Sequence, residues 1–168
     1  MNVVAVVTAV LTSTMLSACG AWQGVSDTSV GAYKAVFHKQ AKVLNVDLNA
    51  RASLNPDEAN RPVSVAVRIY QLKDRRSFDS ASYDDLLKNE RAVLSSDLQD
   101  TASAVVNPGS AVSLSQPMLP DTGYIAIAAF FRNPKNDNDW RRVIPRKVLS
   151  ATEPLKFDLV EQELVSRQ

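Results

Sequence analysis

The stretch Leu44–Leu54, with the sequence LNVDLNARASL, decides the fold. Apolar side chains occupy every second position, and polar or charged residues such as Asp47 and Arg51 separate them. This alternation predicts a β-strand with one buried and one solvated face, because successive side chains of a strand point to opposite faces. Residues 55–62, NPDEANRP, predict a polar loop, and VSVAVRIY at 63–70 alternates again. The loop exceeds the roughly two to five residues of most hairpins, so it is a place to look for function.

The rest of the chain contains further strands and little else. Residues 122–132, TGYIAIAAFFR, form a nearly continuous apolar run, which is typical of a strand covered on both faces. The segments WRRVIPRK (140–147) and PLKFDLVEQELV (154–165) follow it as strand candidates. Pro108-Gly109 predicts a type II turn between two short apolar runs. Because strands and helices do not alternate, we expect an all-β fold, an antiparallel β-sandwich of about seven or eight strands.

One short helix is expected in addition to the strands. Ser82 and Asp85 match a capping box, in which the first residue and the residue three positions later cap each other. The pattern predicts a helix from about Ser82 to Arg91. The adjacent carboxylates of Asp84 and Asp85 are better explained as capping and solubilising groups than as an acid/base pair, since consecutive helical positions diverge by about 100°.

The only cysteine, Cys19, follows a leader of 18 residues without a charged side chain. The apolar run Val3–Leu11 is too short to span a bilayer, which takes about 20 residues. It fits the apolar region of a secretory signal, although no Lys or Arg precedes it. Leu16-Ser17-Ala18-Cys19 resembles a bacterial lipobox, so we expect cleavage before Cys19 and lipid on its sulfur. The alternative is an incidental cysteine in an uncleaved helix.

These patterns divide the chain into three parts. We expect a lipoprotein signal peptide at 1–18, a lipidated N-terminus and flexible tether at 19–40, and a β-sandwich domain at 41–168. A flexible tether of this length has a root-mean-square reach of about 25 Å. Gly20 stands where an aspartate would indicate inner-membrane retention, which favours the periplasmic face of the outer membrane. With its one cysteine bound to lipid, the domain must fold without disulfides.

Composition and motifs exclude several classes of function. The net charge is +1, with 19 basic and 18 acidic residues interspersed, so nucleic-acid binding is not expected. The only histidine, His38, lies in the expected tether, and no Gly-x-Ser-x-Gly motif occurs. Counted from Asn133 as a calcium loop, positions six and twelve hold Asn138 and Ile144 instead of Gly and Glu. We expect no enzyme, no metal and no cofactor apart from the covalent lipid, and therefore an adaptor.

The chain resembles the TssJ (VasD/Lip) lipoproteins of the type VI secretion system. The matching pieces are the lipobox cysteine, the alternating strand with its polar loop, and the segments VSVAVRIYQL, FDSASYDDLL, VVNPG and TGYIAIAAFFRNP with the later WRRVIP. The resemblance implies a transthyretin-like β-sandwich with an added helix, under the outer membrane. It also implies binding to the periplasmic C-terminal domain of the inner-membrane protein TssM, within a complex of TssJ, TssL and TssM.

The resemblance further implies that the loop after the first strand contacts TssM. Carried onto this sequence, the contact residues are Asn55, Pro56, Asp57, Glu58, Ala59, Asn60 and Arg61. The alternative for this loop is a solvated connection without a partner. The alternative for the whole protein is a small-molecule-binding or carrier lipoprotein with a transthyretin-like fold, which would need a buried apolar cavity with convergent polar groups.

Overall fold

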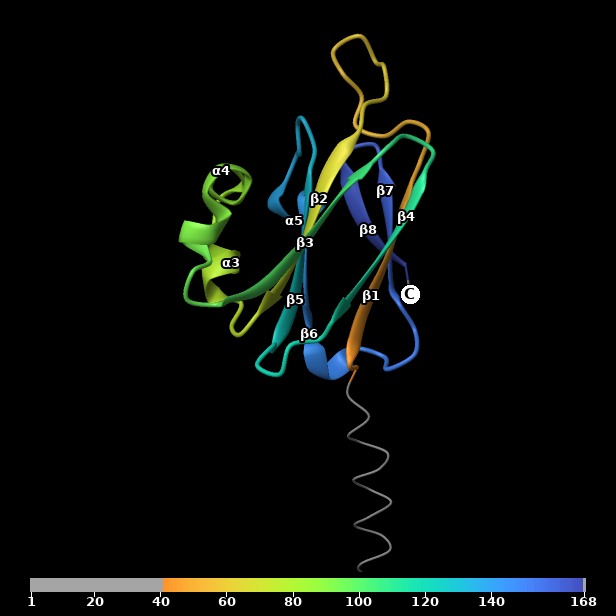
Figure 1. Cartoon of the computed structure of the whole chain (residues 1–168). Coiled ribbons are helices and arrows are strands. Elements are labelled where there is room, and N and C mark those ends of the chain that lie inside the picture. Colours follow the sequence, from red (N-terminus) through yellow and green to blue (C-terminus); the bar gives the residue numbers. More distant parts are fainter. Residues whose placement is uncertain (1–40, 168) are drawn as a thin grey trace, which may run out of the picture. The chain divides into compact units, whose positions relative to one another are not determined.

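Two four-stranded sheets pack face to face in residues 41–167, the part of the chain that the computed structural model describes (Figure 1). The first sheet has the strand order β4-β1-β7-β8 and the second β3-β2-β5-β6. The strands are β1 (Val43–Ala50), β2 (Val65–Leu72), β3 (Leu98–Val106), β4 (Ala111–Pro117), β5 (Tyr124–Phe130), β6 (Arg141–Pro145), β7 (Leu155–Val160) and β8 (Glu163–Arg167). The expected β-sandwich is confirmed. The expected signal peptide, lipidated Cys19 and tether lie outside the described residues.

Five of the six strand pairings in this range are antiparallel, and β1 pairs with β7 in parallel, Val46 opposite Leu155. The sequence predicts an antiparallel sandwich, and the parallel pair of β1 and β7 departs from that prediction. The parallel pair arises because β6 ends in the 3₁₀ turn η1 (Arg146–Val148), from which the chain crosses to the other sheet. β7 then starts at the end of the sandwich where β1 starts (Figure 1).

The alternating pattern that opens the domain is only partly a strand. Leu44, Val46 and Leu48 are buried in β1, as predicted. The strand ends at Ala50, and Leu54 N–H donates to the Arg51 carbonyl at 3.1 Å in a turn. Leu54 is nevertheless fully buried. The alternating pattern therefore extends past the end of the strand, because the turn places Leu54 in the core.

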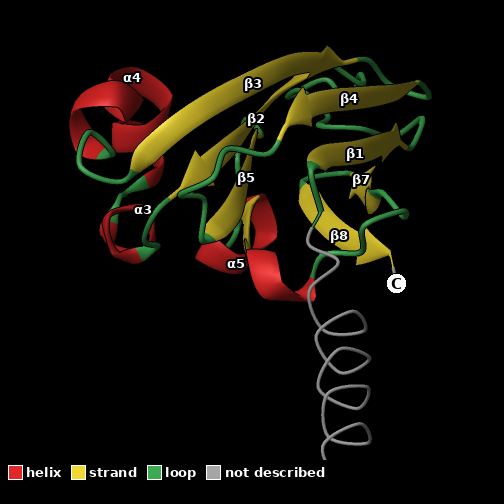
Figure 2. Cartoon of the chain, turned by 60° about the horizontal axis from the view of Figure 1, so that its bottom comes forward, coloured by secondary structure: helices red, strands yellow, loops and turns green. Residues whose placement is uncertain are grey.

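The central strand β5 is covered on both faces, and so is the second half of β2 from Ile69 to Leu72, whereas Ala66 in its first half is exposed. All residues of β5 from Ile125 to Phe130 are buried, which confirms the prediction from the apolar run. Two helices, α3 (Arg76–Ser80) and α4 (Tyr83–Val93), lie outside the second sheet, as Figure 2 shows. Their contact with the sheet includes the rings of Phe78 and Tyr70, whose centroids are 5.8 Å apart.

The capping box of α4 is confirmed. Ser82 Oγ accepts the Asp85 N–H at 3.1 Å, and the Asp85 carboxylate accepts the Ser82 N–H at 3.2 Å. The helix is kinked at Asn89, whose φ and ψ are −133° and 26°. Arg68 from β2 donates to the carbonyls of Leu86 at 2.7 Å and Leu87 at 3.3 Å, just before the kink. The sequence predicts one helix, and α3 and α5 (Asp137–Trp140) are additions of five and four residues.

The Pro108-Gly109 turn also forms as predicted. Gly109 has a φ of 68°, and Ser110 N–H donates to the Asn107 carbonyl at 3.1 Å. The turn links β3 and β4, which belong to different sheets, so it closes one side of the sandwich instead of forming a hairpin within a sheet.

A buried glutamine, Gln71 of β2, holds together the end of the sandwich at which β1 begins. Its Nε2 donates to the Pro117 carbonyl, and its Oε1 accepts from Leu119 N–H and Thr122 Oγ, all at 2.9 Å. These groups belong to the last residue of β4 and to the segment between β4 and β5. Because the glutamine is fully buried, water cannot replace these three bonds, and they tie the segment to β2.

We expect Gln71→Leu to lower the free energy of unfolding by about 3 kcal/mol, since it leaves buried donors and an acceptor without partners. Urea denaturation measures this change. The control is Gln99→Leu on the edge strand β3, where the amide contacts only the neighbouring Leu98 carbonyl at 3.4 Å. The control should stay within about 0.5 kcal/mol of the unmodified protein. Equal stability of the two variants would contradict this role of Gln71.

Candidate functional site

The loop between β1 and β2 lies at the opposite end of the sandwich from the start of β1 (Figure 1). It follows the last residue of β1, Ala50, and precedes Val65, the first residue of β2. Of the seven residues proposed from the sequence as contacts, 55–61, Asn55 lies at the buried base of the loop, and the others follow it toward the tip. Two other connections approach its base, the Pro108-Gly109 turn and the turn between β7 and β8. Ser64 Oγ, near the base, donates to Asn107 Oδ1 at 2.7 Å.

Asn55 fixes the base of the loop. It is buried and has a φ of 49°, a left-handed conformation that asparagine tolerates better than most residues. Its N–H donates to the Glu161 carbonyl at 2.6 Å, and its Oδ1 accepts the Arg132 N–H at 2.8 Å. Its Nδ2 donates to the Ser64 carbonyl at 3.2 Å. Asn55 therefore ties the loop to two other segments, through its backbone N–H to Glu161 and through its side chain to Arg132, and its side chain also bonds the far end of the loop at Ser64.

Asp57 organises the tip of the loop. Its carboxylate accepts N–H groups from Ala59 at 2.9 Å and Arg61 at 2.8 Å, and it pairs with the Arg61 guanidinium at 2.8 Å. Its own N–H donates to the Arg61 carbonyl at 2.9 Å. The Arg61 N–H and then the Arg61 side chain hold the pKa of Asp57 below its usual value of 3.8. The carboxylate is thus ionised at neutral pH, and its hydrogen bonds and its ion pair are made within the loop.

The seven candidate residues therefore divide into two groups. Asn55 is buried, and Pro56 and Asp57 are half-buried, so these residues shape the loop. The residues that can meet a partner are exposed: Glu58, Ala59, Asn60 and Arg61. Sequence reasoning missed Arg132, Glu161 and Ser64 as supports of the base. Arg132 lies 77 positions from Asn55 and contributes only its backbone N–H, so no local pattern could have identified it.

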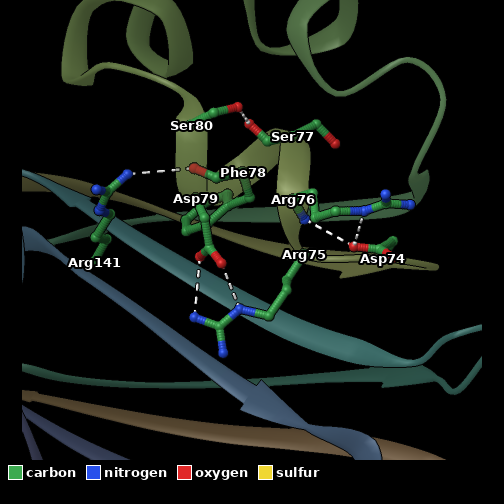
Figure 3. Close-up of polar contacts among 8 residues, drawn as sticks. All are labelled: Asp74, Arg75, Arg76, Ser77, Phe78, Asp79, Ser80 and Arg141. Carbon is green, nitrogen blue, oxygen red and sulfur yellow. Dashed lines mark hydrogen bonds and ion pairs between the residues drawn. The ribbon is translucent and has the colours of Figure 1, made fainter.

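A second polar feature is an open cleft between α3 and β6 with a volume of about 450 Å³. Its lining residues are Arg75, Asp79, Arg141, Arg142 and Val143. Figure 3 shows that two nitrogens of Arg75 donate to the Asp79 carboxylate, at 2.5 and 3.1 Å. It also shows that Arg141 donates to the Phe78 carbonyl, at 3.3 Å. The Arg75–Asp79 pair lies within α3 and its N-cap, and the Arg141 bond from β6 holds this short helix against the sheet. The cleft is therefore explained by the attachment of α3.

Neither this cleft nor a second one is a buried apolar cavity of the kind that a small-molecule carrier would need. The second of them, about 520 Å³, lies between α4 and β3 and is lined mainly by polar and charged side chains, including Arg68 and Glu90. Among residues 41–167, no three His, Cys, Asp or Glu side chains gather as metal ligands. Over the same residues, no helix is long and apolar enough to cross a membrane.

Comparisons with known proteins agree with this architecture. The family model described as "Type VI secretion lipoprotein, VasD, EvfM, TssJ" matches residues 42–162. A search of curated protein sequences finds no significant match.

Three solved structures illustrate the likeness. A chain of a structure described as a type VI membrane complex is 35% identical, with a TM-score of 0.73, and the match covers 77% of this chain and 100% of that chain. A chain of a structure of the TssM C-terminal domain from EAEC is 34% identical, with a TM-score of 0.67, and the match covers 76% and 98%. Lip of Serratia marcescens, described as a membrane-bound component of the type VI secretion system, shares the fold at 17% identity, a TM-score of 0.67 and coverage of 75% and 97%.

The family match extends over most of the chain, from the residue before β1 to the turn between β7 and β8. The family consists of structural, non-enzymatic lipoproteins, in agreement with the expectation from the sequence. The chain belongs to the TssJ (VasD) family of type VI secretion lipoproteins.

Proposed function

We propose that this lipoprotein anchors the type VI secretion membrane complex to the outer membrane by binding the periplasmic C-terminal domain of TssM. Its lipid, on Cys19, inserts into the membrane, and its sandwich holds the partner within a complex of TssJ, TssL and TssM. Similarity at 35% and 34% identity to chains of a type VI membrane complex and of a TssM C-terminal domain structure supports this partner. The observation that carries the proposal is the rigid loop 55–61.

The loop suits a partner contact because its shape is fixed before binding. Asn55 locks its base, and Asp57 locks its tip through four bonds within the loop. A preformed loop loses little conformational entropy on association, so more of the contact energy appears as affinity. The exposed charges of Glu58 and Arg61 are suited to steering the encounter and setting the register.

The position of the loop suits an anchor as well. It lies at the far end of the sandwich from Ala41, where the described chain begins (Figure 1), and Cys19 precedes Ala41 by 22 positions. A lipid on Cys19 and a partner on the loop would therefore act at opposite ends of the domain. The leader of 18 residues and Gly20 favour the periplasmic face of the outer membrane.

Replacement of the lipidated cysteine tests the anchor. We expect Cys19→Ser to leave the sandwich folded, to shift the protein from the outer-membrane fraction to the soluble periplasm, and to abolish type VI secretion. Density fractionation and a secretion assay measure the two effects, and circular dichroism checks the fold. Retention in the outer membrane together with normal secretion would show that the anchor is elsewhere.

Replacement of the loop tip tests the partner contact. The triple change Glu58→Gly, Ala59→Ser and Asn60→Gly keeps Asn55 and Asp57 in place. We expect it to weaken binding to the TssM C-terminal domain at least about tenfold, or about 1.4 kcal/mol, with an unchanged unfolding midpoint. Titration calorimetry measures the affinity. The control is Ser95→Gly with Ser96→Gly, in an exposed turn after α4, which should bind normally. Equal affinity of both variants would place the interface elsewhere.

The internal carboxylate provides a separate test, because Asp57 shapes the loop from within. We expect Asp57→Ala to speed the hydrogen exchange of the Ala59 and Arg61 amides and to weaken TssM binding severalfold. Since the folded-state pKa of Asp57 is lowered, its stabilising effect is present above its unfolded pKa and is lost only as the pH falls through the lowered value. The protection of the Ala59 and Arg61 amides, relative to an unfolded chain at the same pH, should therefore persist at pH 3.8, the usual pKa of an aspartate. Fast exchange of these amides at that pH would show that the ionised Asp57 carboxylate does not hold the tip of the loop.

A further inference from the structure

The end of the sandwich at which β1 begins carries an unusual set of exposed side chains. We refer to it as the tether end, and it comprises Lys42, Val43, the segment after β2, the β4–β5 segment, and residues 146–153. Lys42, Lys73 and Lys147 are exposed there, and none of them forms an ion pair with another described residue.

Two exposed valines lie at the same end. Val43 is 46% exposed and Val148 is 64% exposed, and they are two of the four large apolar side chains that are exposed within residues 41–167. Val148 directly follows Lys147 in the 3₁₀ turn η1, and Val43 directly follows Lys42. A narrow crevice lined by Val43 and Leu149, among others, places the two segments side by side. Figure 1 shows this turn next to the start of β1.

Backbone bonds fix these segments relative to one another. Met118 N–H donates to the Lys42 carbonyl at 2.9 Å, and Gly123 N–H donates to the Leu72 carbonyl, just before Lys73, at 2.8 Å. Arg146 N–H donates in turn to the Gly123 carbonyl at 2.9 Å. A β-carbon on Gly123 would come within 2.6 Å of the Lys73 carbonyl oxygen, so only glycine permits this approach. The lysines therefore stand on a rigid platform.

The charge of the platform is positive. The Arg146 guanidinium donates to the carbonyls of Leu119, Pro120 and Thr122 at 2.7 to 3.2 Å and has no carboxylate partner among the described residues. With the three lysines it makes four cations without ion pairs, against two exposed carboxylates there, Asp121 and Glu153. Asp74 and Arg76 neutralise each other at 3.2 Å. Exposed apolar groups flanked by lysines are the chemistry of a protein surface that rests on anionic lipid headgroups.

We propose that the tether end docks on the anionic headgroup surface of the bilayer that holds the lipid of Cys19. This inference rests on the proposed lipid anchor. The 21 residues between Cys19 and Ala41 keep the domain near the bilayer. A weak contact therefore suffices, because tethering makes the second binding event intramolecular. Docking orients the domain, and the loop 55–61, at the opposite end, then points away from the membrane toward the periplasm.

The test uses the lipidated full-length protein with one added cysteine, because the sulfur of Cys19 is then blocked by lipid. Ala151→Cys, exposed at the tether end, and Ala59→Cys, exposed on the far loop, are each labelled with the polarity-sensitive fluorophore NBD. The proteins are reconstituted into vesicles of phosphatidylethanolamine and phosphatidylglycerol, or of phosphatidylcholine alone. We expect a blue shift of the emission at 151 in the anionic vesicles only, none at 59, and loss of the shift at about 1 M salt, where the Debye length is about 3 Å.

Charge reversal separates this contact from lipid insertion. Lys73→Glu with Lys147→Glu should abolish the shift at 151, while Lys88→Glu with Lys135→Glu, the same change in net charge away from the tether end, should keep it. Vesicle flotation reports the lipid anchor independently, and every variant should float. Absence of flotation would contradict the lipid anchor itself. Three results would contradict the membrane contact instead: flotation without a spectral shift, a shift that does not depend on the lysine charges or on salt, and a shift that requires added TssM domain.

Discussion

The two-sided burial of the central strand β5 is the constraint on which the rest of the fold depends. Ile125 to Phe130 of β5 are buried on both faces, so a second layer must cover the outer face of this sheet. The helices α3 and α4 supply that layer (Figure 2). Both come directly after β2, which lets a short segment cover the sheet without interrupting the strand order. The outer face of the first sheet is polar, with Asp47 bonded to Ser113 at 2.6 Å, and needs no cover.

Arginines donate hydrogen bonds to carbonyls that the covering helices leave without helical partners. Short or kinked helices leave carbonyls without helical partners, and these carbonyls lie against an apolar sheet. Arg68 satisfies the carbonyls of Leu86 and Leu87 at the kink of α4, and Arg141 satisfies those of Phe78 and Ala81 at the end of α3. Each guanidinium reaches from a neighbouring strand. These two arginines are therefore part of the attachment of the outer layer.

The sequence predicts the features that are encoded locally. Alternation and apolar runs identified the strands, Ser82 and Asp85 identified α4, and Pro108-Gly109 identified its turn. The features it missed depend on distant partners. α3 has five residues and is held by Arg141, more than 60 positions away, and the parallel pairing of β1 with β7 spans more than 100 positions. The loop was identified by its prolines and polarity, but its frame depends on a buried Asn55 that contacts Arg132 and Glu161.

The position of β1 fits a domain that is pulled from both ends. This strand leads from Lys42 at the tether end to the loop at the other end, over a length of about 26 Å for eight residues. It lies between β4 and β7 and is hydrogen-bonded to both. A force between a lipid anchor and a partner on the loop would act along the direction of β1. It would act in shear on the backbone hydrogen bonds that join β1 to β4 and to β7, so that many bonds would resist it together. An edge strand would offer one ladder only. The fold thus places its best-supported strand of the first sheet on the direct line between the two proposed attachments.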